Sequence, residues 1–266
     1  LSILTFSLIF SSCKEEEEEV VIPQNNATAR VQVIHNCADL AAASVDIYLN
    51  NNLLIDNFNF RTASSFIDAP ANEEFSVSVA PSTSVSSSEA LVTYNFTLAE
   101  GETYVLVADG TISPTGYSPV QAFSIEVYPL GREVASYATN TDLLIHHGST
   151  DAPTVDVVET GVGAGTIVDN ASYKDFTDYL ELPTSDYTLD IRDESGMVTV
   201  ATFSAPLATL NLMGMSAVVV ASGFLDPSNN SNGPSFGLYV ALPAGGDLVA
   251  LPAGKSLNNT IPNSSL

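Results

Sequence analysis

The sequence predicts an all-β protein built from two tandem antiparallel β-sandwich domains. Short runs of β-branched and aromatic residues, separated by turn-forming residues, recur along the 266-residue chain. The pattern of the first half returns in the second half at an offset of about 113 residues, as from Asp56 to Asp169. No stretch keeps the 3.6-residue periodicity of an amphipathic helix over three turns. These observations favour a duplicated β unit.

The internal repeat is clearest in one pair of segments that align without a gap. DNFNFRTASSFIDAP at 56–70 aligns with DNASYKDFTDYLELP at 169–183. Upstream, VQVIHNCAD ends at Asp39 and LLIHHGSTD ends at Asp151. Downstream, GETYVLVADG ends at Gly110 and GMSAVVVASG ends at Gly223. We therefore place the domains at 30–136 and 141–254, with a C-terminal tail at 255–266.

Each domain contains several runs with strand character. In the first domain we expect strands at 31–35, 44–49, 75–81, 91–98, 103–110 and 123–129. In the second domain we expect them at 154–159, 187–193, 197–203 and 216–223. The segments AEGE and RDESG are turn signals typical of hairpins. About seven short strands per hundred residues is typical of an immunoglobulin-like sandwich, but the absence of tryptophan excludes an antibody-type core.

The first 12 residues are typical of a lipoprotein signal peptide. Leu1 to Phe10 form an apolar run too short to span a bilayer, and two small serines precede Cys13. The basic region and the initiator methionine are absent, so we expect the signal to be N-terminally incomplete. The pattern resembles a bacterial lipobox, in which the cysteine becomes acylated. Several acyl chains would give stable membrane anchoring.

The residues after Cys13 indicate where in the cell the protein is located. Lys14 precedes five glutamates, and this stretch resembles the lipoprotein export signal of Bacteroidetes, which directs lipoproteins to the outer surface of the outer membrane. A charged spacer is the alternative. Residues 13–29 are therefore expected to be a lipidated tether. The predicted export signal comprises Lys14, Glu15, Glu16, Glu17, Glu18 and Glu19.

The charge balance limits the partners. The chain has 31 acidic and 7 basic residues and a formal net charge of −24. Nucleic acids and anionic lipid headgroups are disfavoured, because binding them requires clusters of lysine and arginine. Extracellular glycans and proteins stay open as partners, and the oligomeric state stays undetermined. Calcium could stabilise so acidic a chain, although no complete calcium loop occurs.

Two histidine–aspartate pairs recur at equivalent positions. His35 and Asp39 in the first domain correspond to His147 and Asp151 in the second. Each pair is short of the three or four ligands that zinc requires. The favoured interpretation is a strand corner at which both side chains bond to backbone groups, and weak metal binding is the alternative.

Two of the seven basic residues also fall at one repeat position. Arg61 and Lys174 follow the aromatic residues Phe60 and Tyr173. A cation beside aromatic rings could contact a glycan or an acidic peptide. The alternative is that each cation covers apolar surface or pairs locally with Asp68 or Glu181.

Together these segments resemble the domain-of-unknown-function family 4397. The matching features are a histidine near the end of the first strand, an aspartate four residues on, a Val-Asp pair, and the closing pattern Y-x-x-x-x-x-G. The resemblance implies bacterial extracytoplasmic β domains, often in tandem, and it implies no activity. No nucleophile elbow is present, so no catalytic residues are assigned.

The sequence thus favours a surface lipoprotein whose two modules bind or adhere to a glycan or a protein. A structural spacer of the cell envelope and a hydrolase acting on surface polysaccharide are the alternatives.

Overall fold

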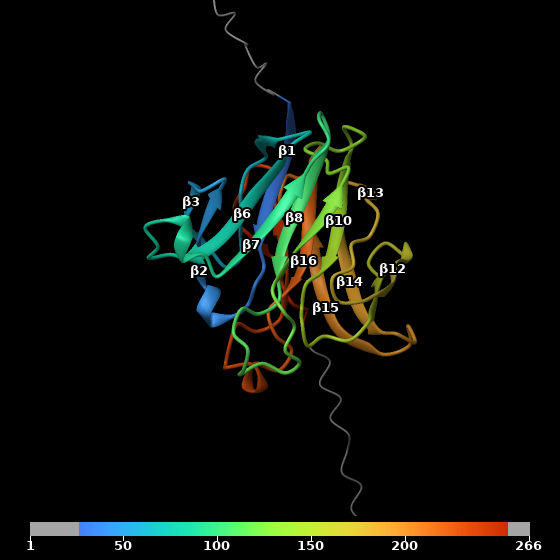
Figure 1. Ribbon diagram of the computed structural model, residues 1–266. Helices are drawn as coiled ribbons and strands as arrows, with labels where there is room; N and C mark the ends of the chain where they lie inside the picture. Colours follow the sequence, from blue (N-terminus) through green and yellow to red (C-terminus); the bar gives the residue numbers. More distant parts are fainter. Residues whose placement is uncertain (1–26, 255–266) are drawn as a thin grey trace, which may run out of the picture.

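The computed structural model describes residues 27–254, and these form an all-β protein of four stacked sheets (Figure 1). The predicted all-β class is confirmed. Within the described residues the helical segments are single 3₁₀ turns, η1 (Leu40–Ala42), η2 (Ser87–Glu89) and η3 (Pro227–Asn229). None of the described helices is long and apolar enough to cross a membrane. The predicted signal, the lipidated Cys13, the export signal and the tail at 255–266 lie outside the described residues.

The first repeat is a sandwich of two sheets, which we name the first outer and the first inner sheet. The outer sheet has the order β3-β2-β6-β7, with β2 (Ser44–Leu49), β3 (Asn52–Asn59), β6 (Glu74–Pro81) and β7 (Val92–Thr97). The inner sheet has the order β18-β4-β1-β8-β9, and β5 also pairs with β1. Its strands are β1 (Thr28–His35), β4 (Thr62–Ala63), β5 (Ile67–Pro70), β8 (Thr103–Asp109), β9 (Ser124–Pro129) and, from the C-terminal part of the chain, β18 (Gly246–Asp247).

The second repeat has the same plan. Its outer sheet has the order β12-β11-β14-β15, with β11 (Val155–Glu159), β12 (Gly165–Ala171), β14 (Asp186–Asp193) and β15 (Thr199–Pro206). Its inner sheet has the order β13-β10-β16-β17-β19, with β10 (Asn140–His147), β13 (Leu180–Pro183), β16 (Ser216–Ser222), β17 (Gly237–Ala241) and β19 (Val249–Ala250).

One strand pair in each repeat is parallel, which departs from a purely antiparallel sandwich. β1 pairs with β8 in parallel, and β10 pairs with β16 in the same way. Between each such pair the chain passes through the whole outer sheet, so the crossover is long enough to permit parallel pairing. The carboxyl ends of both strands in each pair therefore lie at the same end of the sandwich.

The two inner sheets pack face to face and share a core. In β8, Val105 and Val107 face the other repeat, whereas Leu106 faces the first outer sheet. β10 and β16 contribute Leu144, Val218 and Val220 to this shared core. Successive side chains of a strand point to opposite faces, so these central strands bury both faces. The sandwiches consequently lie side by side and form one unit.

Candidate functional site

The corner after β1 is built around Asp39. Its carboxylate accepts hydrogen bonds from the Ala41 and Ser113 backbone N–H groups and from the hydroxyl of Tyr117 (2.9, 2.6 and 2.8 Å). Burial opposes ionisation of Asp39, but the bonds from Ser113 and Ala41 outweigh it and lower its pKa. Asp39 therefore connects the corner after β1 to the loop after β8.

Asp151 has the same role in the second repeat. It accepts hydrogen bonds from the backbone N–H groups of Leu225 and Asp226 (both 2.9 Å) and from the side-chain amide of Asn230 (3.0 Å). The corner after β10 is thereby held against the loop after β16. This is the strand-corner geometry expected from the repeated aspartates.

The histidines of these corners also bond to backbone. His35 Nε2 lies 2.8 Å from the Ala42 carbonyl oxygen, and His147 Nε2 lies 3.1 Å from that of Pro153. Burial lowers the pKa of His35 to about 4 and also lowers the pKa of His147. Across residues 27–254, no group of three or more histidine, cysteine or acidic side chains could hold a metal ion. Both histidines therefore join their strand corner to a backbone carbonyl.

The ends of all four parallel strands meet at one end of the molecule. Asp109 ends β8, and its Oδ2 lies 2.6 Å from Nε2 of His146 in β10. Asn36 Nδ2 bonds to the other oxygen of Asp109 (2.7 Å) and to the Gly148 carbonyl (3.3 Å). Asn36, Asp109 and His146 are each at most 1% exposed. The corners and loops of both repeats therefore form one surface, which we name the loop face: 36–43, 110–123, 148–154 and 223–236.

The two long loops of the loop face are interlocked. The ring of Tyr117 from the first repeat stacks on Phe224 from the second, with centroids 5.5 Å apart. The backbone N–H of Ser118 donates to Asn230 Oδ1 (2.9 Å), and the hydroxyl of Ser231 donates to the Gly116 carbonyl (2.8 Å). The loops are thus braced against each other. Figure 1 shows them at the bottom of the view, with the start of β1 at the top.

The exposed side chains of the loop face are mainly neutral. Leu40, Val120 and Leu225 are each about half exposed (52%, 50% and 50%). Serine and asparagine are frequent in the loop at 223–236. The two aromatic rings that join the loops are buried, at 7% for Tyr117 and 1% for Phe224.

The predicted ligand-contact residues lie at the boundary between the repeats, where Arg61 and Phe60 border the loop face. Arg61 of the first repeat bonds to Ser222 and to the Ser235 carbonyl (2.7 Å), and its guanidinium lies 3.9 Å from the ring centre of Tyr239. The guanidinium also lies 4.7 Å from the ring centre of Phe60. Arg61 therefore directs its donors into the second repeat, and contact of Arg61 with a ligand stays a prediction.

Lys174 makes the reciprocal connection. Its ammonium group bonds to Ser124 and Glu126 of the first repeat (2.7 and 2.9 Å). Neighbouring Tyr173 is half-buried, its hydroxyl has no hydrogen-bond partner among the described residues, and burial raises its pKa. Neither cation makes the expected local pair, because Asp68 is bound by Arg30 and Glu181 by Arg132.

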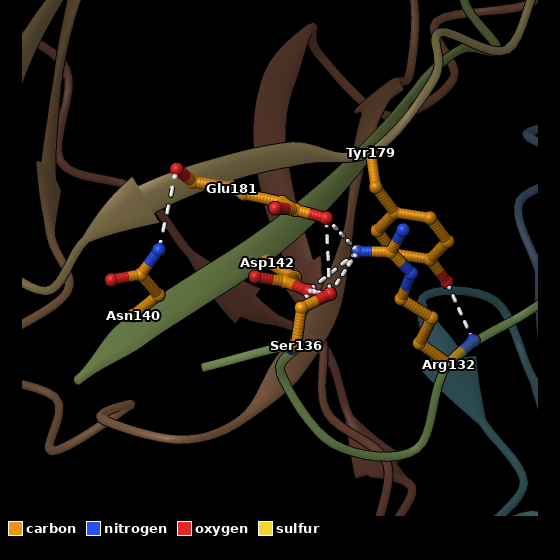
Figure 2. Close-up of polar contacts among 6 residues, drawn as sticks. All are labelled: Arg132, Ser136, Asn140, Asp142, Tyr179 and Glu181. Carbon is orange, nitrogen blue, oxygen red and sulfur yellow. Dashed lines mark hydrogen bonds and ion pairs between the residues drawn. The ribbon is translucent and has the colours of Figure 1, made fainter. Parts of the chain in front are cut away.

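The segment 130–139 between β9 and β10, which we name the linker, holds the second repeat through Arg132 (Figure 2). Its Nη1 lies 2.6 Å from Asp142 and 2.8 Å from Glu181, and its guanidinium lies 4.5 Å from the ring centre of Tyr179. Asp142 is fully buried and also accepts from the backbone N–H and hydroxyl of Ser136. The next linker residue, Glu133, pairs with Arg30 in β1 (2.8 Å). Adjacent side chains thus tie the linker to both repeats.

Comparison with protein families identifies both halves of the chain. The model of the domain of unknown function DUF4397 matches residues 29–124 and again 141–231. The chain belongs to the DUF4397 family. The two DUF4397 repeats coincide with the two sandwiches, so the resemblance inferred from the sequence is confirmed. No curated protein matches the chain significantly.

Similarities between this tandem DUF4397 chain and solved structures are distant. A streptococcal virulence factor that binds alpha-glucan is 8% identical, with a TM-score of 0.23 over 72% of this chain and 92% of that chain. A family 41 carbohydrate-binding module from streptococcal virulence factors is 9% identical (TM-score 0.21; 72% and 93%). A candidate adhesin from Bacteroides ovatus is 10% identical (TM-score 0.23; 86% and 96%). At these TM-scores the similarities carry no argument about a ligand.

Proposed function

We propose that this protein is a non-catalytic binding module of a bacterial surface lipoprotein, and that its loop face binds the partner. The observation that carries the proposal is the interlocking of the two long loops, in which Tyr117 of one repeat stacks on Phe224 of the other. Both repeats contribute to one braced surface, and a rigid surface loses little conformational entropy on binding. Loops at one end of a sandwich are a common binding position.

The side-by-side arrangement favours this function over a spacer. Two sandwiches joined end to end would give length, whereas these share a core of inner-sheet residues and together span only the length of one sandwich. The arrangement also disfavours two independent binding sites, one on each repeat. One composite surface is the better description.

The chemistry of the loop face favours a protein partner. Half-exposed aliphatic side chains, Leu40, Val120 and Leu225, suit the apolar centre of a protein interface. Sugar rings are usually held by exposed aromatic faces, and the rings of Tyr117 and Phe224 are used within the protein. A glycan partner is therefore the second choice.

The position of the N-terminus supports display of the loop face. β1 begins at Thr28, at the end of the molecule opposite the loop face (Figure 1). Anchoring through acylated Cys13 would therefore turn the loop face away from the outer membrane. We propose this orientation together with a location on the cell exterior.

Binding is tested with two variants of matched exposure. Leu40→Ser alters the loop face, and Leu53→Ser alters β3; both leucines are 52% exposed. The full chain is screened against matrix and cell-surface proteins and against a glycan array. We expect a protein ligand whose binding weakens about tenfold, or about 1.4 kcal/mol, in Leu40→Ser only. Equal loss in both variants, or binding confined to glycans, would contradict the assignment.

The location is tested by protease treatment of intact cells. Surface display predicts that the protein is digested without lysis and that Cys13→Ala releases it from the membrane fraction. Protection in intact cells and digestion only after lysis would exclude the exterior location.

A further inference from the structure

The first repeat carries an added strand at one edge of its inner sheet. β18 comes from the C-terminal part of the chain and pairs with β4, Gly246 opposite Ala63 and Asp247 opposite Thr62. Two further backbone bonds extend the pairing, Leu248 N–H to the Arg61 carbonyl (2.8 Å) and Phe66 N–H to the Pro243 carbonyl (3.3 Å). The segment 243–248, which turns at 243–244 and pairs as a strand at Gly246–Asp247, therefore completes this edge.

The equivalent edge of the second repeat has the same backbone geometry. Lys174 N–H donates to the His147 carbonyl as Arg61 N–H does to that of His35 (both 2.8 Å). Thr177 N–H donates to Ile145 as Ser64 N–H does to Val33 (2.9 and 2.8 Å). The backbone groups of Phe176 must then point outward, as those of Ala63 point towards β18.

This second edge is open. Within residues 27–254, the backbone groups that correspond to those bonded by β18 have no hydrogen-bond partner: the Lys174 carbonyl, both groups of Phe176, and the Tyr179 N–H. In the first repeat the linker follows β9, at the position that corresponds to β18 after β17. The linker does not run along the second edge; its Val134 instead forms a β-bridge with Met215. The burial differs accordingly, since Phe66 is buried and Tyr179 is half-buried.

A groove runs along the open edge. Its volume is about 380 Å³, and its walls are β12 and the segment 175–180. β12 is itself the edge strand of its sheet. An open strand edge beside a groove is the geometry in which an extended peptide adds as a further strand.

The charge of the groove defines the peptide. Asp169, Asp175 and Asp178 line it, all three are exposed, and no lysine or arginine lines it. In the first repeat, the positions of Asp175 and Asp178 are held by Thr62 and Ser65, and the strand bound there carries an aspartate, Asp247. The second edge therefore suits a strand of opposite charge.

We propose that the edge at 174–179 of the second repeat binds an extended, cationic peptide segment of a partner protein by strand addition. This interaction surface is separate from the loop face, so either assignment can fail without the other. The backbone of Phe176 supplies the pairing, and the three aspartates select lysine or arginine on the bound strand.

The experiment uses two matched synthetic peptides and the isotope-labelled full chain. One peptide has the sequence of residues 241–248, ALPAGGDL, and the other carries Ala244→Lys and Asp247→Lys, which leaves both positive-φ glycines in place. We expect the lysine peptide to bind about tenfold more tightly at low salt, because each exposed ion pair contributes about 0.2–1 kcal/mol. Amide resonances at 174–179 should shift, and hydrogen exchange at the Phe176 amide should slow at least about tenfold at saturation.

Variants separate charge selection from simple attraction to an acidic protein. Asp169→Asn with Asp178→Asn should abolish the preference for the lysine peptide, whereas Glu102→Gln with Glu194→Gln removes two exposed charges elsewhere and should retain it. N-methylation of alternate peptide residues should abolish binding. The proposal would be overturned if the resonance shifts lay outside 165–180 or if the methylated peptide bound equally well. It would also be overturned if the peptide bound only after deletion of 255–266, because that result would assign the groove to the chain's own tail.

Discussion

Arg61 and Lys174 occupy equivalent positions in the two repeats, and each side chain crosses to the other repeat. Arg61 reaches Ser222, Ser235 and Tyr239, and Lys174 reaches Ser124 and Glu126. Tyr239 and Glu126 are themselves equivalent, since they lie 113 residues apart like Arg61 and Lys174. The contact between the repeats is therefore reciprocal, and it uses two of the chain's seven basic residues.

The two cations should contribute unequally to stability. Arg61→Ala removes three hydrogen bonds and two cation–π contacts at a partly buried position, so we expect a loss of about 2–3 kcal/mol. Lys174→Ala removes a pair whose lysine side chain is 36% exposed, so we expect at most about 1 kcal/mol. Urea unfolding of both variants measures this. Equal losses of stability in the two variants would show that the additional hydrogen bonds of the Arg61 guanidinium contribute nothing.

Gly148 should tolerate no side chain. A Cβ there would meet the side-chain amide of Asn36 and lie 2.6 Å from Asp109 Oδ1. We expect Gly148→Ala to cost more than about 2 kcal/mol, since overpacking at a buried site strains the structure. Combining it with Asn36→Ala removes the closer of these two contacts, so the double variant should be less destabilised than the sum of the single ones. Strict additivity in thermal or urea unfolding would contradict this geometry.

Breaking the linker contact should leave a buried charge. Arg132→Ala removes the cation from fully buried Asp142, and we expect a loss of about 3 kcal/mol. Asp142→Asn in the same chain removes that charge and should recover part of the loss. The matched change at the linker's contact with the first repeat, Glu133→Ala, breaks an exposed pair with Arg30 and should cost less than about 1 kcal/mol. Stability is measured by calorimetric unfolding of the variants. A larger loss of stability in Glu133→Ala than in Arg132→Ala would contradict the prediction.

Stability should fall in mild acid because of His35. Its pKa is lowered by burial to about 4 in the folded state, from 6.5 when exposed. The unfolded chain therefore binds a proton more readily, and stability is complete above about pH 6.5 and lost as the pH falls towards 4. The loss approaches about 3 kcal/mol, and His147 acts in the same direction. Unfolding at pH 7 and pH 4.5 should show a smaller difference in His35→Gln; an unchanged difference would exclude His35 as the cause.

The sequence by itself determined the β class, the duplication and the identity of the corner residues. Alternating β-branched runs and a constant offset can be read directly from the sequence. They do not depend on how the two repeats pack against each other. Asp39 and Asp151 were recognisable because a repeated Asp after a strand favours bonds to nearby backbone.

Only the tertiary structure decided which faces are buried and where the cations lie. Arg61 and Lys174 looked available for a ligand because their partners lie more than 45 residues away in sequence, in the other repeat. One local signal did exist: Val105–Val107 and Val218–Val220 are apolar without alternation, which is typical of strands buried on both faces. The open edge at 174–179 has no such signal. The backbone of both repeats is alike there, and only the path of distant residues 243–248 covers one edge and leaves the other free.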